Sequence, residues 1–157
     1  MKKVVNILLG AILGLVAGGI SVGKLYKKIV GNREEKIDKF KRYYNMLNQW
    51  LILSQQNKPL SQYFINSGYR SIAIYGMGEM GQRLYDELKD SEIEMKYVID
   101  REENIYTPIE IHDPESVIDG VDVVVVTAVF DYERIIEKLA DKASCPIISL
   151  EDVISSI

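Results

Sequence analysis

The spacing of apolar residues divides the chain into three regions. From Val4 to Val22 the sequence is apolar except for Asn6 and Ser21. From Asn32 to about Gln56, apolar residues recur every three or four positions, which predicts a helix. From Ser71 onward, short apolar runs alternate with amphipathic stretches. This last pattern predicts strands alternating with helices, and so an α/β domain.

The first region has the length and composition of a membrane span. A helix over the 19 residues Val4 to Val22 would be ~28 Å long, close to the thickness of a bilayer core. We therefore expect residues 1–23 to be a single-pass transmembrane anchor. A cleaved secretory signal stays open as the alternative, because Lys2 and Lys3 resemble an n-region and Ala17–Gly19 resembles a cleavage site.

The charges around this region predict its orientation. Four cations follow the apolar run, whereas Lys2 and Lys3 precede it; those four are Lys24, Lys27, Lys28 and Arg33. The positive-inside rule then favours a cytoplasmic C-terminal domain, and the same cations suit anionic lipid headgroups. We expect the protein to be a membrane protein with that topology.

Two features of the first two regions suit self-association. Gly10, Gly14 and Gly18 recur every four residues, and small residues at this interval let membrane helices approach closely. The predicted helix carries a heptad stripe of Ile37, Phe40, Tyr44, Leu47 and Leu51. A second stripe of Tyr43, Met46, Trp50 and Leu53 lies beside it. The two stripes suit either a homodimer or a helix packed on a globular body. Residues 24–68 as a whole are expected to be a basic helical linker.

The third region opens on a glycine-rich turn. Ser71–Tyr75 reads as a buried strand, and Gly76, Gly78 and Gly81 follow with the spacing G-x-G-x-x-G before an amphipathic helix. In a dinucleotide-binding turn the first glycine makes the bend, the second admits the pyrophosphate and the third packs the helix on its strand. The helix N-terminus then receives the phosphates.

Polar residues that follow two later strands extend this candidate site. Asp100 ends the second predicted strand, 24 residues after Gly76, where a carboxylate can accept ribose hydroxyls. Arg101 follows it and can contact a 2′-phosphate, so both NAD and NADP are candidate cofactors. Thr127 ends the apolar strand that begins at Val121, at the expected ligand edge of the sheet. The candidate binding residues are therefore Gly76, Met77, Gly78, Glu79, Met80, Gly81, Asp100, Arg101 and Thr127.

The remaining elements complete a small, mostly parallel sheet over residues 69–157. We expect a short strand over Thr107–Ile111, a helix from Asp113 to Gly120, and a last strand over Pro146–Leu150. Asp131 is expected to cap the helix that follows the Val121–Thr127 strand. His112 would lie at the carboxyl end of its strand.

Composition excludes several classes of function. Residues 1–68 carry 11 Lys and Arg against 3 Asp and Glu, whereas residues 69–157 carry 8 against 20. A domain with a balance of −12 is a poor partner for nucleic acid. The single cysteine, Cys145, allows no internal disulfide and no cysteine-based metal site. We therefore expect neither nucleic-acid binding nor a bound metal.

The segments 72–81, Tyr97–Asp100 and Val123–Thr127 together resemble the Rossmann-like NAD(P)-binding domain of bacterial polysaccharide-biosynthesis proteins. The similarity is greatest to the N-terminal module of nucleoside-diphosphate-sugar epimerases and dehydratases. The resemblance implies phosphate binding by the glycine turn, ribose binding by Asp100, and a dinucleotide or a nucleotide sugar as the ligand.

The departures from that family concern catalysis. Its epimerases and dehydratases carry a Tyr-x-x-x-Lys pair on a later helix, whereas the pair in this sequence, Tyr85 and Lys89, falls in the helix directly after the glycine turn. We therefore predict no catalytic residue in this chain. Three functions stay open: a membrane-anchored binding module, an epimerase or oxidoreductase completed by a partner chain through His112 or Thr127, and a homodimerising scaffold.

Overall fold

The computed structural model describes residues 30–31, 33–102 and 107–157. The expected anchor over residues 1–23 lies outside them. Within the described ranges, no helix has both the length and the apolar character needed to cross a bilayer. The chain divides into two compact units between Tyr44 and Asn45, and all the described strands belong to the second unit.

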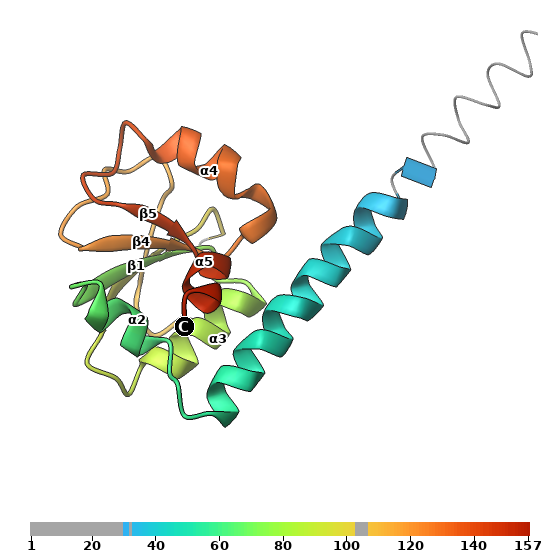
Figure 1. Ribbon diagram of the computed structural model, residues 1–157. Coiled ribbons are helices and arrows are strands. Elements are labelled where there is room, and N and C mark those ends of the chain that lie inside the picture. The colour runs from blue at the N-terminus through green and yellow to red at the C-terminus, as the bar shows by residue number, and fades with distance from the viewer. Residues whose placement is uncertain (1–29, 32, 103–106) are drawn as a thin grey trace, which may run out of the picture. The chain divides into compact units, whose positions relative to one another are not determined.

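The second unit is built around a parallel sheet of five strands in the order β3-β2-β1-β4-β5 (Figure 1). The strands are β1 (Ser71–Tyr75), β2 (Glu94–Ile99), β3 (Glu110–His112), β4 (Val123–Val126) and β5 (Ile147–Ser149). All four residues of β4 are buried, as its unbroken run of valines predicts for a central parallel strand. The expected α/β class and mostly parallel, Rossmann-like sheet are confirmed.

Helices cover both faces of this sheet. They are α2 (Ser61–Asn66), α3 (Glu79–Leu88), α4 (Tyr132–Leu139) and α5 (Leu150–Ser155), with a 3₁₀ turn, η1 (Val129–Asp131), before α4. Figure 1 shows α4 on one side of the sheet, with α3 and α5 on the other. Ile135 and Leu139 of α4 pack against Ala73 and Val124, which lie on that face of the central strands.

The chain passes from β1 outward to β2 and β3, then returns to β4 on the other side of β1. This reversal creates a topological switch point between the carboxyl ends of β1 and β4, where open α/β sheets bind ligands.

Asp122, just before β4, connects the amino ends of β1 and β4. The Asp122 carboxylate accepts the N–H groups of Arg70 and Ser71 at 2.7 and 2.8 Å, and these bonds hold its pKa below the usual range.

The connection between β3 and β4 differs from the prediction. The expected helix from Asp113 to Gly120 is absent, and the segment is irregular, with a turn at Pro114 and Glu115 and a bridge residue at Ile118. The Asp113 carboxylate accepts the N–H of Glu115 at 2.6 Å, and Ile118 pairs with Ala143 in a parallel bridge. A helix would remove the extended backbone that this bridge needs, so tertiary pairing overrides the local capping pattern. The strand expected over Thr107–Ile111 is also shorter, since β3 begins at Glu110.

The predicted linker helix is present over residues 33–55, and its two apolar stripes have different environments. Met46, Trp50 and Leu53 of the second stripe are 5, 7 and 2% exposed, so they belong to the core of the second unit. The heptad stripe remains between 41 and 75% exposed; its members are Ile37, Phe40, Tyr44, Leu47 and Leu51. Met46, Trp50 and Leu53 therefore pack within the second unit, whereas the side chains of the heptad stripe are exposed.

Glu87 on α3 connects this helix to the α/β body. Its carboxylate accepts the indole N–H of Trp50 and, at 2.7 Å, the backbone N–H of Leu60. The sequence pattern does not indicate this contact, because the three residues are far apart in the chain. Both donors would lose their partner if the carboxylate were removed.

We expect Glu87→Ala to lower the free energy of unfolding by about 2 kcal/mol, because two donors lose a charged acceptor. Urea denaturation followed by the fluorescence of Trp50, the chain's single tryptophan, measures this change. Glu92→Ala, at an exposed position, is the matched control. Equal stability of the two variants would contradict the role assigned to Glu87.

Candidate functional site

The glycine turn joins β1 to α3 and is shaped by two of its three glycines. Gly76 has a φ of +90°, a conformation that side chains other than glycine rarely adopt. A Cβ atom on Gly81 would lie 2.2 Å from the Gly76 carbonyl oxygen. The two residues therefore make the bend and bring the helix against it, which are the structural roles predicted for the first and third glycines.

Gly78 has no such structural reason to be glycine. Its φ is −66°, and a Cβ atom placed on it would meet no protein atom within 4 Å. It is the N-cap residue of α3, yet no side chain caps the helix there. Serine, threonine, asparagine or aspartate would fit and would add a capping bond. The chain instead leaves the helix N-terminus open and the space beside it empty.

Asp100 follows β2, and its carboxylate faces the glycine turn. One carboxylate oxygen accepts the N–H of Met77 at 2.8 Å, and the other accepts the N–H of Glu102 at 3.1 Å. Each carboxylate oxygen has two lone pairs, so Asp100 retains the capacity to accept further donors such as ribose hydroxyls. The structure thus brings Asp100 and the turn together, although they are more than 20 residues apart in sequence.

Thr127 holds the turn through a hydrogen bond from its hydroxyl to the backbone. Its side chain is buried, 4% exposed, and its hydroxyl lies 2.6 Å from the Gly76 carbonyl oxygen and 3.2 Å from that of Tyr75. Met77 and Met80 are also buried, at 2 and 8% exposure. The side chains of these three residues are therefore buried and not exposed to a ligand on the turn.

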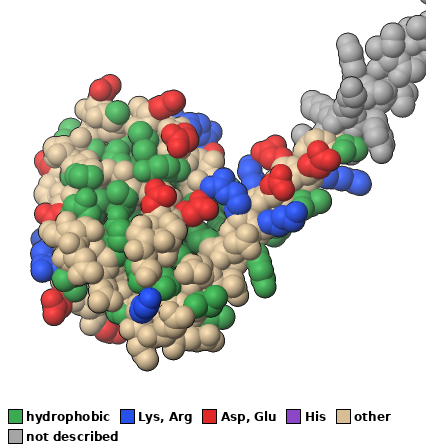
Figure 2. Space-filling model, viewed as in Figure 1, with side chains coloured by type: hydrophobic (Ala, Val, Ile, Leu, Met, Phe, Trp, Pro, Cys, Tyr) green, Lys and Arg blue, Asp and Glu red, His purple; other side chains and the backbone are tan. Residues whose placement is uncertain are grey.

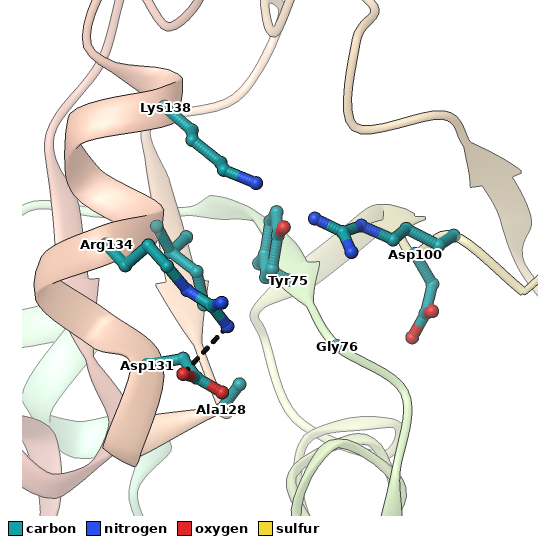
Figure 3. Close-up of a pocket in the computed structure, with 9 residues that line it drawn as sticks. Tyr75, Gly76, Asp100, Ala128, Asp131, Arg134 and Lys138 are labelled. Atoms are coloured by element: carbon teal, nitrogen blue, oxygen red, sulfur yellow. Dashed lines mark ion pairs between the residues drawn. The ribbon is translucent and has the colours of Figure 1, made fainter.

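An open cleft of about 220 Å³ lies beside the turn, at the switch point between β1 and β4 (Figure 3). Its lining includes Gly76, Tyr75, Arg101, Arg134 and Lys138. Burial raises the pKa of the Tyr75 hydroxyl, and the Arg101 guanidinium partly opposes this shift. The hydroxyl therefore stays protonated near neutral pH and can donate a hydrogen bond.

Sequence reasoning missed the two cations that α4 contributes to the cleft, Arg134 and Lys138. Their spacing of four residues on the helix after β4 places them on one face, which is the available signal. Asp131 was expected to cap this helix, but no capping bond forms; its carboxylate instead pairs with Arg134 at 2.8 Å. Figure 3 shows this ion pair between two residues that line the cleft.

Other residues considered for chemistry lie elsewhere. His112 belongs to β3, the outer strand, and stacks on Tyr97 with 4.1 Å between ring centroids. Its Nε2 atom lies 3.4 Å from the Glu110 carboxylate, and it does not line the cleft. Tyr85 lies in the last turn of α3 and Lys89 is its C-cap residue, both at the end of the helix opposite the glycine turn.

Metal-ligating side chains do not cluster anywhere in residues 30–31, 33–102 and 107–157. Comparison of the chain with models of protein families and with curated proteins finds no match. The candidate site is therefore defined by its geometry: an uncapped helix N-terminus, the Asp100 carboxylate facing it, and a cleft lined by three cations and two carboxylates, Asp100 among them.

Proposed function

We propose that this protein is a membrane-anchored module that binds a dinucleotide or a nucleotide sugar. The observation that carries the proposal is the open space at Gly78. A glycine that the fold does not require, at a helix N-terminus without a cap, leaves backbone N–H groups free for a diphosphate. Asp100 faces the same turn, and in this proposal its carboxylate accepts the ribose hydroxyls of the nucleoside.

The cellular context of the proposal comes from the sequence. The apolar run over Val4–Val22 and the cations that follow it suit an anchor with the C-terminal domain in the cytoplasm. The resemblance to nucleotide-sugar enzymes supports a role in the synthesis of cell-envelope polysaccharides. Because Tyr85 and Lys89 lie away from the glycine turn, we propose that the chain is a binding module without chemistry of its own.

Isothermal titration of the full chain in detergent against NAD⁺, NADP⁺ and UDP-glucose tests this function. We expect at least one ligand to bind with a Kd below ~1 mM, which corresponds to about −4 kcal/mol. Mass spectrometry of the denatured protein shows in addition whether a nucleotide copurifies. The absence of binding to all three nucleotides, with none copurified, would contradict the proposal.

A second candidate function, a homodimerising scaffold, is favoured by the exposed heptad stripe. Phe40 and Tyr44 are 75 and 69% exposed, and large apolar side chains repeated along one helix face commonly mark a protein interface. Figure 2 shows hydrophobic side chains standing out from this helix. The a and d spacing of the stripe is that of a coiled-coil seam.

We expect Phe40→Glu to weaken self-association of the detergent-solubilised chain at least tenfold if this stripe forms the dimer, because the charge would have to be desolvated in the seam. Sedimentation equilibrium measures the change. Gln49→Glu, which adds the same charge at an exposed position outside the stripe, is the matched control. Equal association of the two variants would exclude the stripe as the interface.

A further inference from the structure

One peptide of the glycine turn, the peptide between Gly76 and Met77, is held by side chains at both of its polar groups. Its carbonyl oxygen accepts the hydroxyl of Thr127, which follows β4, at 2.6 Å. Its N–H donates at 2.8 Å to the carboxylate of Asp100, which follows β2. The C=O and N–H groups of a trans peptide point in opposite directions. Side chains that follow the two strands flanking β1 therefore fix the orientation of this peptide from two sides.

The hydroxyl of Thr127 is explained by the turn and not by the packing of the strand. Four valines precede it, Val123–Val126, and a fifth valine would have nearly the same shape without a polar group. A hydroxyl on a side chain that is only 4% exposed costs free energy unless it is hydrogen-bonded. Its proton goes to Gly76, because the Tyr75 carbonyl oxygen is farther away, at 3.2 Å, and already accepts the Thr127 N–H.

Gly76 is the residue that makes such a hold necessary. With a φ of +90° it forms the bend without steric cost, but a glycine also offers little resistance to rotation of the peptide that follows it. If that peptide turned over, the Gly76 carbonyl oxygen would face the Asp100 carboxylate in place of the Met77 N–H, and the two acceptors would repel each other. Asp100 would then keep only one of its two backbone donors, the N–H of Glu102.

From this arrangement we infer that Thr127 is a positioning residue for the ligand. It orients the Asp100 carboxylate through the Gly76–Met77 peptide and does not touch the ligand itself. Thr127 is buried and lies outside the lining of the cleft, whereas Gly76 and Asp100 belong to that lining. The inference rests on the proposed function, because it requires Asp100 to contact the nucleotide. It holds for whichever part of the nucleotide Asp100 contacts.

Exchange of the Met77 amide hydrogen tests this hold without any ligand. The rate is measured by two-dimensional NMR of the isotope-labelled full chain in detergent. Thr127→Val removes the hydroxyl and keeps the shape of the side chain. We expect the Met77 amide of this variant to exchange about tenfold faster, because its peptide is then held at one end only. Thr127→Ser keeps the hydroxyl, so its exchange rate should stay within about twofold of that of the unmodified chain.

Thr107→Val is the matched control, since Thr107 is the other threonine of the chain and its hydroxyl accepts the N–H of Ile109. It should leave the exchange rate of the Met77 amide unchanged. The buried amides of β4 report general stability, and they should keep their exchange rates in Thr127→Val. An unchanged Met77 rate in Thr127→Val would overturn the inference. An equal acceleration of the β4 amides would also overturn it, by showing a general loss of stability.

Nucleotide affinity then relates this hold to binding. The ligand is whichever of NAD⁺, NADP⁺ and UDP-glucose binds the unmodified chain most tightly. We expect Thr127→Val to raise its Kd about fivefold or more and Thr127→Ser to leave it within about twofold. Faster exchange at Met77 with an unchanged Kd in Thr127→Val would overturn the positioning role and leave the proposed function standing. If none of these nucleotides binds the unmodified chain, the proposed function is wrong, and the positioning role falls with it whatever the exchange rates show.

Discussion

Replacing Gly81 with alanine should lower the free energy of unfolding by at least about 3 kcal/mol, with nucleotide affinity lost at the same time. The added Cβ would lie 2.2 Å from the Gly76 carbonyl oxygen, a backbone atom that cannot move independently. The helix must therefore shift off the turn. Alanine's helix propensity, worth about 1 kcal/mol over glycine, opposes this loss without compensating for it.

Thermal and urea unfolding followed by circular dichroism measures the effect of Gly81→Ala. Gly78→Ala is the matched control, because it adds the same methyl group to the same turn in open space. We expect the control to unfold close to the unmodified chain. If Gly81→Ala is as stable as the control, the close contact between Gly81 and the Gly76 carbonyl group is contradicted.

Gly78→Asp should change stability and binding in opposite directions. The aspartate side chain can cap α3 and complement the positive end of the helix dipole, which raises the free energy of unfolding by about 0.5–1 kcal/mol. The same carboxylate occupies the backbone N–H groups that a diphosphate would use and repels its charge. We expect nucleotide affinity to fall at least tenfold, or about 1.4 kcal/mol.

Calorimetric titration alongside thermal unfolding separates the two effects of Gly78→Asp. Gly78→Asn provides the capping bond without the charge, so it should stabilise the helix with a smaller loss of affinity. If Gly78→Asp binds nucleotides as well as the unmodified chain does, the ligand does not use the N-terminus of α3. A loss of both stability and affinity would indicate instead that Gly78 is required by the fold.

The sequence alone determined those features that depend on neighbouring residues. The run of four valines predicted a central buried strand, and G-x-G-x-x-G between a strand and an amphipathic helix predicted the turn. Positive φ at Gly76 and the contact between Gly81 and Gly76 follow from this spacing. Such patterns are readable because strand burial, turn geometry and helix periodicity depend on contiguous residues.

Tertiary structure decided the features that depend on residues far apart in the chain. It brought Arg101 into one cleft with Arg134 and Lys138, and it gave Trp50 a partner in Glu87. It also replaced the expected helix after Asp113 with an irregular segment, because the pairing of Ile118 with Ala143 requires extended backbone. It buried Met46, Trp50 and Leu53 of one apolar stripe on the linker helix and left the adjacent heptad stripe exposed. The physical reason is common to all four. Each outcome depends on which helices and strands pack against one another in the folded chain, and the spacing of residues within one segment does not determine that packing.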